Sequence, residues 1–212
     1  MEEKSVYRKF FKRLIDLLLS GISLLMLAVP MLILALIVKL DSQGPVLFWQ
    51  KRVGLHKEIF LMPKFRSMYT QTPAEVPTHM LSDPDRWITP VGKIYRKLSI
   101  DELPQLWSIF TGKMSIIGPR PALWNQDDLI AERDKYGAND VRPGLTGWAQ
   151  INGRDELEIP VKAKLDGEYV EKMSFLFDCK CFFGTILAVL RRDGVVEGGT
   201  GAMEKEKDKV EK

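Results

Sequence analysis

The chain has 212 residues, which is enough for one domain with a sizeable core. Its 31 basic and 28 acidic side chains leave a net charge of +3, too small to indicate a nucleic-acid partner. The chain has two histidines, which argues against His-based catalysis and zinc chemistry. Cys179 and Cys181 stand at alternate positions, a spacing that suits no easy disulfide, so we expect free thiols in a reducing compartment.

The N-terminal segment is strongly apolar. From Leu17 to Val38 it has no charged residue, and as a straight helix it would be about 33 Å long, enough to span a bilayer. Pro30 lies inside this run and predicts a bend, because proline removes a helical hydrogen bond. Basic residues flank both ends, whereas a spanning helix normally has them on one side. They are Lys4, Arg8, Lys9, Lys12 and Arg13 before the run, and Lys39, Lys51, Arg52 and Lys57 after it.

We therefore hypothesise a re-entrant helix–break–helix hairpin that keeps both ends at the cytoplasmic face. A plain membrane-spanning helix kinked at Pro30 is the alternative, since proline kinks are tolerated in such helices.

The next part of the chain predicts short elements. Ile59–Met62 is expected as a strand that leads to Lys64. The polar stretch Thr70–Asp85 is expected as a loop. Residues 88–97 predict a helix with Thr89 as N-cap and Pro90 at its first position, and 103–110 predict a second, apolar helix.

The second half predicts three more helices, over 125–136, 159–172 and 174–190, the last lying against the membrane surface or the core. Between the first two lies the glycine-punctuated stretch Val141–Arg154. Its glycines allow either a close backbone approach to a ligand, with Arg142 and Arg154 as anion partners, or a tight structural turn.

These elements predict a mainly α fold with a few short strands. We expect a membrane-embedded re-entrant hairpin over residues 1–45 and a compact cytosolic catalytic domain with interfacial amphipathic helices over 46–195. The Glu- and Lys-rich end, 196–212, is expected to be a disordered charged tail.

The stretch from Arg96 to Gln105 carries the chemistry. Asp101 and Glu102 follow two cations, and the Gly-Pro-Arg-Pro turn at 118–121 adds Arg120. Carboxylates beside fixed cations suit a site that holds a hard metal ion and handles phosphate. The alternative is an ordinary helix start, with Ser99 as N-cap and Glu102 completing a capping box.

In this order, the motifs resemble the bacterial sugar transferase family, the monotopic phosphoglycosyl transferases. The resemblance rests on the apolar segment ending at Asp41–Pro45 and on Lys64–Met68, Arg96–Gln105, Met114–Pro121 and Arg142–Arg154, and it extends through Asp166 to Asp178.

The resemblance implies transfer of a sugar-1-phosphate from a nucleotide sugar, usually a UDP-sugar, to polyprenol (undecaprenyl) phosphate, with release of UMP. Asp101 would be the nucleophile that forms a phosphosugar-aspartyl intermediate, and Glu102 would ligate Mg²⁺. Arg96, Arg120 and Lys64 would hold phosphate oxygens, with Arg142 and Arg154 as further candidates. The implied location is the bacterial inner membrane, with membrane lipids as partners and the catalytic domain on the cytoplasmic face.

One departure and two rival functions remain. The family commonly has Ser-Pro at the bend, where this chain has Val29-Pro30, so Ser20 or Ser23 is expected to supply the missing hydroxyl. The rivals are a membrane-bound phosphohydrolase of nucleotide sugars and a non-enzymatic membrane scaffold. The sequence leaves open the sugar, the glycan that is built and whether the chain forms a homodimer.

Overall fold

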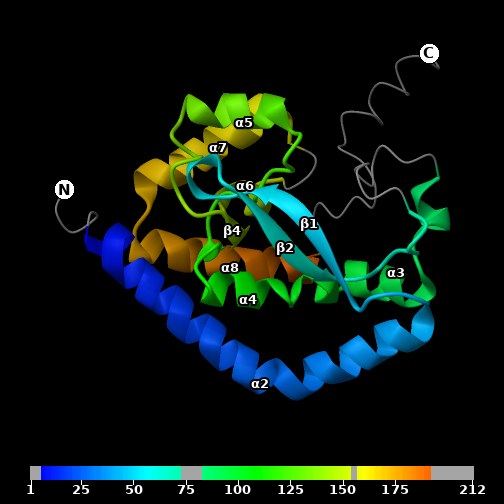
Figure 1. Cartoon of the computed structure of the whole chain (residues 1–212). Coiled ribbons are helices and arrows are strands. Elements are labelled where there is room, and N and C mark those ends of the chain that lie inside the picture. The colour runs from blue at the N-terminus through cyan, green and yellow to red at the C-terminus, as the bar shows by residue number, and fades with distance from the viewer. Residues whose placement is uncertain (1–5, 73–82, 154–156, 192–212) are drawn as a thin grey trace, which may run out of the picture.

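The computed structural model describes residues 6–72, 83–153 and 157–191 (Figure 1). Helices dominate, and the strands form two separate two-stranded sheets, which confirms the mainly α fold with a few short strands. The helices are α2 (Lys12–Asp41), α3 (Pro90–Lys97), α4 (Gln105–Phe110), α5 (Asp127–Asp134), α6 (Trp148–Ile151), α7 (Ile159–Lys172) and α8 (Phe175–Arg191). The strands are β1 (Leu47–Val53), β2 (Ile59–Phe65), β3 (Ser115–Ile117) and β4 (Gly144–Thr146). The predicted tail lies outside the described residues.

Helix α2 follows a short π-helical turn, η1 (Tyr7–Phe11), and is long and apolar enough to cross a membrane by length and composition. Figure 1 shows that it bends near its middle, and Pro30 lies within it. The helix is continuous, so the expected helix–break–helix is a bend rather than an interruption. The Ser20 hydroxyl donates to the Asp16 carbonyl at 2.6 Å and not to the carbonyl of Met26, whose usual helical donor would be the amide that Pro30 lacks.

Both ends of α2 are fastened to the rest of the protein. Near its start, Asp16 Oδ1 accepts a hydrogen bond from the Ile116 amide at 2.9 Å, and Arg13 donates to the last carbonyls of α4. Near its end, Tyr95 Oη donates to the Leu34 carbonyl at 2.9 Å. The middle of the helix is far more exposed, with Leu25 at 82%. The bend therefore projects away from the domain while both ends return to it (Figure 1).

Strands β1 and β2 form an antiparallel hairpin that places Lys64 opposite Phe48. Strands β3 and β4 pair in parallel, with Ser115 opposite Gly144. This second pair is unusually close, because a Cβ at Gly144 would lie 2.1 Å from the Gly118 nitrogen. The glycine-rich stretch therefore packs against the backbone of Gly118, as in the structural-turn interpretation.

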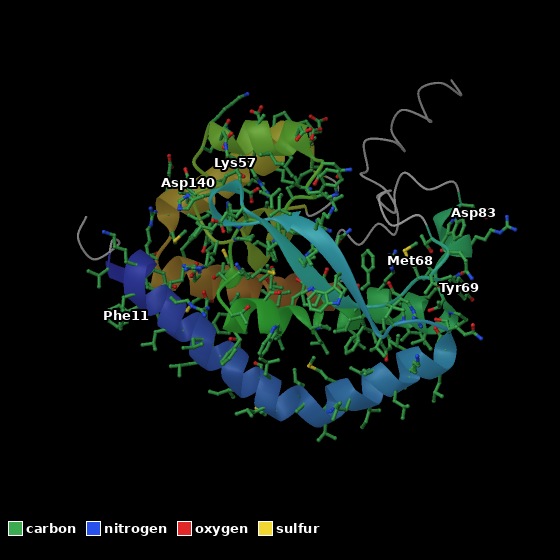
Figure 2. All side chains as sticks on the ribbon, viewed as in Figure 1. Phe11, Lys57, Met68, Tyr69, Asp83 and Asp140 are labelled. Carbon is green, nitrogen blue, oxygen red and sulfur yellow. The ribbon has the colours of Figure 1, made fainter. Side chains whose placement is uncertain are left out.

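The remaining helices give the molecule two different sides. Helices α3, α4 and α8 lie along the side that faces α2, and α5 and α7 lie at the opposite end (Figure 1). Figure 2 shows Phe11 at the start of α2, with Lys57 and Asp140 at the far edge of the domain. Helices α4 and α8, and the residue that follows α3, carry exposed apolar side chains, which include Leu98, Trp107, Leu176, Phe182 and Phe183.

Candidate active site

Four segments bring charged side chains to one place. Lys64 comes from the end of β2 and Arg96 from the last turn of α3. Asp101 and Glu102 lie in the 3-10 turn η5 (Ile100–Glu102), and Arg120 lies in the turn that follows β3. These five residues are called the charged cluster below. The structure thus assembles residues that span 57 positions of the sequence into one site, as the sequence motifs indicated.

Glu102 is the centre of the cluster. Its Oε1 accepts from Lys64 Nζ at 2.9 Å and from Arg120 at 2.5 Å, and its Oε2 accepts from Arg120 at 3.3 Å. Burial alone would raise the pKa of Glu102, but Arg120 and Lys64 outweigh it and hold the pKa well below 4.5. Burial also lowers the pKa of Lys64, against the opposing effect of Glu102. Glu102 is therefore firmly ionised at neutral pH.

Asp101 has the opposite environment. It is 8% exposed, and burial raises its pKa above 3.8, with the adjacent Glu102 charge adding to the increase. Lys64, Arg96 and Arg120 act in the other direction and favour the charged form. Two neighbouring carboxylates therefore differ in character: one is neutralised by two direct ion pairs, and the other is a buried group with cations near it.

The local backbone explains why these carboxylates do not act as a helix cap. Ser99 has φ +54°, in the left-handed region, and its side chain makes no cap hydrogen bond. The capping-box alternative is therefore wrong. Thr89, in contrast, caps α3 as predicted, because its hydroxyl accepts from the Gly92 amide at 2.9 Å. This helix delivers Arg96, whose guanidinium donates to Ser67 Oγ at 3.0 Å and to the sulfur of Met68.

Of the two other predicted anion partners, the structure describes one, Arg142. Arg142 donates to the Gly112 carbonyl at 3.0 Å, just past the end of α4, where Arg13 also donates to carbonyls. Its side chain thus stabilises a helix end in this structure. Arg154 lies outside the described residues. A phosphate contact by either residue stays a prediction.

Arg52 is a cation near the cluster that sequence reasoning did not assign to the site. It donates to the Pro121 carbonyl at 2.8 Å and to Gln50, and its charge lowers the pKa of Lys64. The alternation of side chains along a strand could have predicted its place. Gln50 and Arg52 lie two residues apart on β1, so they share a face of the hairpin with Met62 and Lys64 of β2.

Within the described ranges, no group of three or more His, Cys, Asp or Glu side chains is placed to hold a metal ion. A magnesium ion needs fewer protein ligands than that, because it keeps several waters and commonly takes one or two carboxylates together with substrate phosphates. Glu102 is a carboxylate donor of that kind, with Asp101 next to it in the chain, and Lys64 and Arg120, which contact Glu102, are cations that suit phosphate oxygens. The residues therefore fit a Mg²⁺ that binds together with a diphosphate.

Comparison with known proteins identifies the family. Residues 7–192 match the family described as bacterial sugar transferase, which is most of the chain and contains every residue of the charged cluster. The chain belongs to the bacterial sugar transferase family. The resemblance and the enzyme class predicted from the motifs are thereby confirmed.

Relatives of this sugar transferase differ in length and in the sugar they are named for. It is 40% identical over 184 residues to the "Uncharacterized sugar transferase EpsL" of Bacillus subtilis, covering 87% of this chain and 89% of the relative. It is 43% identical over 185 residues to the "Undecaprenyl-phosphate glucose phosphotransferase" of Komagataeibacter xylinus, covering 82% of this chain and 35% of the relative. It is 37% identical over 189 residues to the "UDP-N-acetylgalactosamine-undecaprenyl-phosphate N-acetylgalactosaminephosphotransferase" of Aeromonas hydrophila, covering 85% of this chain and 44% of the relative. The chain thus spans less than half the length of the latter two.

Proposed function

We propose that this sugar transferase moves a sugar-1-phosphate from a UDP-sugar to undecaprenyl phosphate and releases UMP, as an early membrane step of polysaccharide synthesis. The observation that carries the proposal is the buried Asp101–Glu102 pair among Lys64, Arg96 and Arg120. The names of two relatives support undecaprenyl phosphate as acceptor, and one of them supports a UDP-linked donor. Because those two relatives carry different sugars, the sugar of this chain is left open.

In the proposed mechanism, Asp101 acts as a nucleophile. Its carboxylate forms a bond to the sugar-linked phosphorus while the bond from that phosphorus to the UMP oxygen breaks, and UMP leaves. A phosphate oxygen of the lipid then attacks the same phosphorus and releases Asp101. Two displacements let donor and acceptor use one phosphate site in turn. Lys64, Arg96 and Arg120 favour the charged form of Asp101 against its burial and would hold the phosphoryl oxygens.

Glu102 would hold Mg²⁺ together with the diphosphate of the donor. When bound, the ion would spread the negative charge that develops on the diphosphate. The ion pairs of Glu102 with Lys64 and Arg120 keep the carboxylate ionised and in place before the donor arrives.

The bent helix α2 would lie in one leaflet as a re-entrant hairpin. Its two ends are fastened to the same domain, and its exposed, apolar middle projects away from that domain, which supports the hairpin over a plain span. The exposed apolar residues of α3, α4 and α8 on the same side would meet the membrane surface. This arrangement would place the charged cluster at the cytoplasmic interface, where a soluble nucleotide meets a lipid phosphate.

The test is UMP release from a panel of UDP-sugars with undecaprenyl phosphate in vesicles and Mg²⁺. We expect release that requires the lipid, the metal and Asp101, with the Asp101→Asn variant nearly inactive. Release of free sugar phosphate at the full rate without lipid would indicate a phosphohydrolase. Vesicle binding with no release from any nucleotide sugar would indicate a scaffold.

A further inference from the structure

Residues 64–68 connect the charged cluster to the membrane helix. Lys64 donates a hydrogen bond to Glu102, whereas Phe65 packs with Val38 of α2 and with Tyr95 in one part of the hydrophobic core. Ser67 accepts from Arg96, and Met68 does so through its sulfur. Arg66 lies between these contacts, so its own partners decide how the segment is held.

The Arg66 side chain is buried, at 6% exposure, and its two terminal nitrogens donate to the end of α2 and the turn after it. One terminal nitrogen donates to the Pro45 carbonyl at 2.5 Å. The other donates to the Ser42 carbonyl at 2.6 Å, to Ser42 Oγ at 2.9 Å and to the Val38 carbonyl at 3.3 Å. The last four carbonyls of a helix have no partner within the helix, and they carry a partial negative charge. Arg66 therefore closes the C-terminal end of α2.

The turn after α2 is shaped around this guanidinium. Gly44 has φ +129°, and a Cβ at Gly44 would lie 2.4 Å from the terminal nitrogen of Arg66. Any other residue at position 44 would collide with the guanidinium and also strain the backbone. The Arg66 amide also donates to the Val46 carbonyl at 2.9 Å, so main chain and side chain fix the same contact.

We propose that Arg66 is a positioning residue that sets the height of the charged cluster relative to α2, and so relative to a membrane-borne acceptor. This inference rests on the proposed function. Through Arg66, the end of α2 is held to the segment that supplies Lys64 and orients Arg96. The donor is soluble and reaches the cluster from the water phase, whereas the lipid phosphate is confined to the bilayer surface. A shift of the cluster along the membrane normal therefore affects lipid use more than donor use.

Arg66→Lys is the informative change, because lysine keeps the charge and loses the planar fork that reaches three carbonyls. Gly44→Ala perturbs the same contact from the other side, since its methyl group would lie 2.4 Å from a terminal nitrogen of Arg66, and it would also lie 2.5 Å from Thr70 Cγ2. Arg86→Lys is the matched control, because Arg86 is exposed and outside the charged cluster. Thermal unfolding of all three in detergent identifies any variant that loses activity only because it unfolds.

Three rates are compared for each variant. The first is exchange of labelled UMP into the UDP-sugar without lipid, which reports attack by Asp101 and its reversal. The second is kcat/KM for undecaprenyl phosphate in vesicles, and the third is kcat/KM for a water-soluble, two-isoprenoid phosphate. For Arg66→Lys and Gly44→Ala we expect a loss of at least about tenfold in the second rate and of less than about threefold in the other two. Arg86→Lys should leave all three unchanged.

An equal loss in all three rates would overturn the proposal and make Arg66 a residue of general stability or of the chemistry itself. Unchanged rates in both variants would overturn it as well. If the unaltered protein shows no UMP exchange, the result contradicts the proposed covalent intermediate and not the role of Arg66. The comparison of bilayer and soluble acceptors then still decides the role of Arg66.

Discussion

Glu102→Gln and Asp101→Asn should change thermal stability in opposite directions at neutral pH. Glu102 accepts three hydrogen bonds from two cations, and Gln removes the negative charge that both cations contact directly. The side chains of Glu102 and Lys64 are 15% and 16% exposed, whereas Arg120, at 34%, can turn to water. The loss should therefore be dominated by Lys64 and amount to about 2 kcal/mol, below the roughly 3–5 kcal/mol of a fully buried broken pair.

For a chain of this length, that loss lowers Tm by about 4–8 °C. Asp101→Asn should raise Tm, because it removes a carboxylate whose burial disfavours the charged form. The measurement is thermal unfolding in detergent, followed by tryptophan fluorescence at a series of pH values.

The pH dependence separates the two carboxylates further. The pKa of Glu102 is depressed in the folded state, so its stabilisation is present above its ordinary pKa of 4.5 and is lost as the pH falls through the folded value. The Tm deficit of Glu102→Gln should therefore shrink only at strongly acidic pH. The pKa of Asp101 is raised above 3.8 in the folded state. Its burial therefore lowers the stability of the fold at neutral pH, and this destabilisation disappears as the pH falls below the ordinary pKa. Equal Tm values for Glu102→Gln and the unaltered protein at pH 7 would refute this account of the charged cluster.

Three further predictions concern the packing of the domain and the topology of the membrane helix. Arg133→Met should lower stability by about 3–5 kcal/mol, because it leaves the buried Asp166 carboxyl without the guanidinium that donates to it at 2.6 and 2.8 Å. Adding Asp166→Leu to Arg133→Met should recover part of the loss in denaturant titrations. Gly144→Ala should prevent folding, because its Cβ would lie 2.1 Å from the Gly118 nitrogen, and a normal circular dichroism melt would contradict this. In a variant without Cys179 and Cys181, cysteines at positions 4 and 51 should both be labelled from the cytoplasmic side, whereas Pro30→Ala should favour a straight span with the two labels on opposite sides.

Local signals account for what the sequence predicted well. Thr89 and Pro90 fix the start of α3 through a cap and a preset φ, both of which depend on adjacent residues only. Helix α7 spans the predicted Ile159–Lys172, and Pro160 in its first turn is the local signal for its start. The Asp101–Glu102 pair and its cations were predicted as one site because the motifs occur in the order of a known family.

Contacts between distant segments account for what was missed. The capping box failed because Ser99 takes a left-handed conformation at the turn between α3 and η5, where its side chain cannot cap. Asp16, a charged residue beside the apolar run, is buried because it accepts from the Ile116 amide, a hundred positions away. The role of Arg66 likewise depends on carbonyls at the end of α2. No local pattern in the sequence reports such partners.

The most direct test of the central claim is the intact mass of the protein after incubation with its UDP-sugar and Mg²⁺, without lipid acceptor. We predict an increase equal to one sugar-phosphoryl group, that is, the mass of the UDP-sugar minus that of UMP, mapped to Asp101, absent from Asp101→Asn, and removed when undecaprenyl phosphate is added. Product formation by the unaltered protein with no such adduct, or an adduct that persists in Asp101→Asn, would contradict the assignment of Asp101 as the nucleophile.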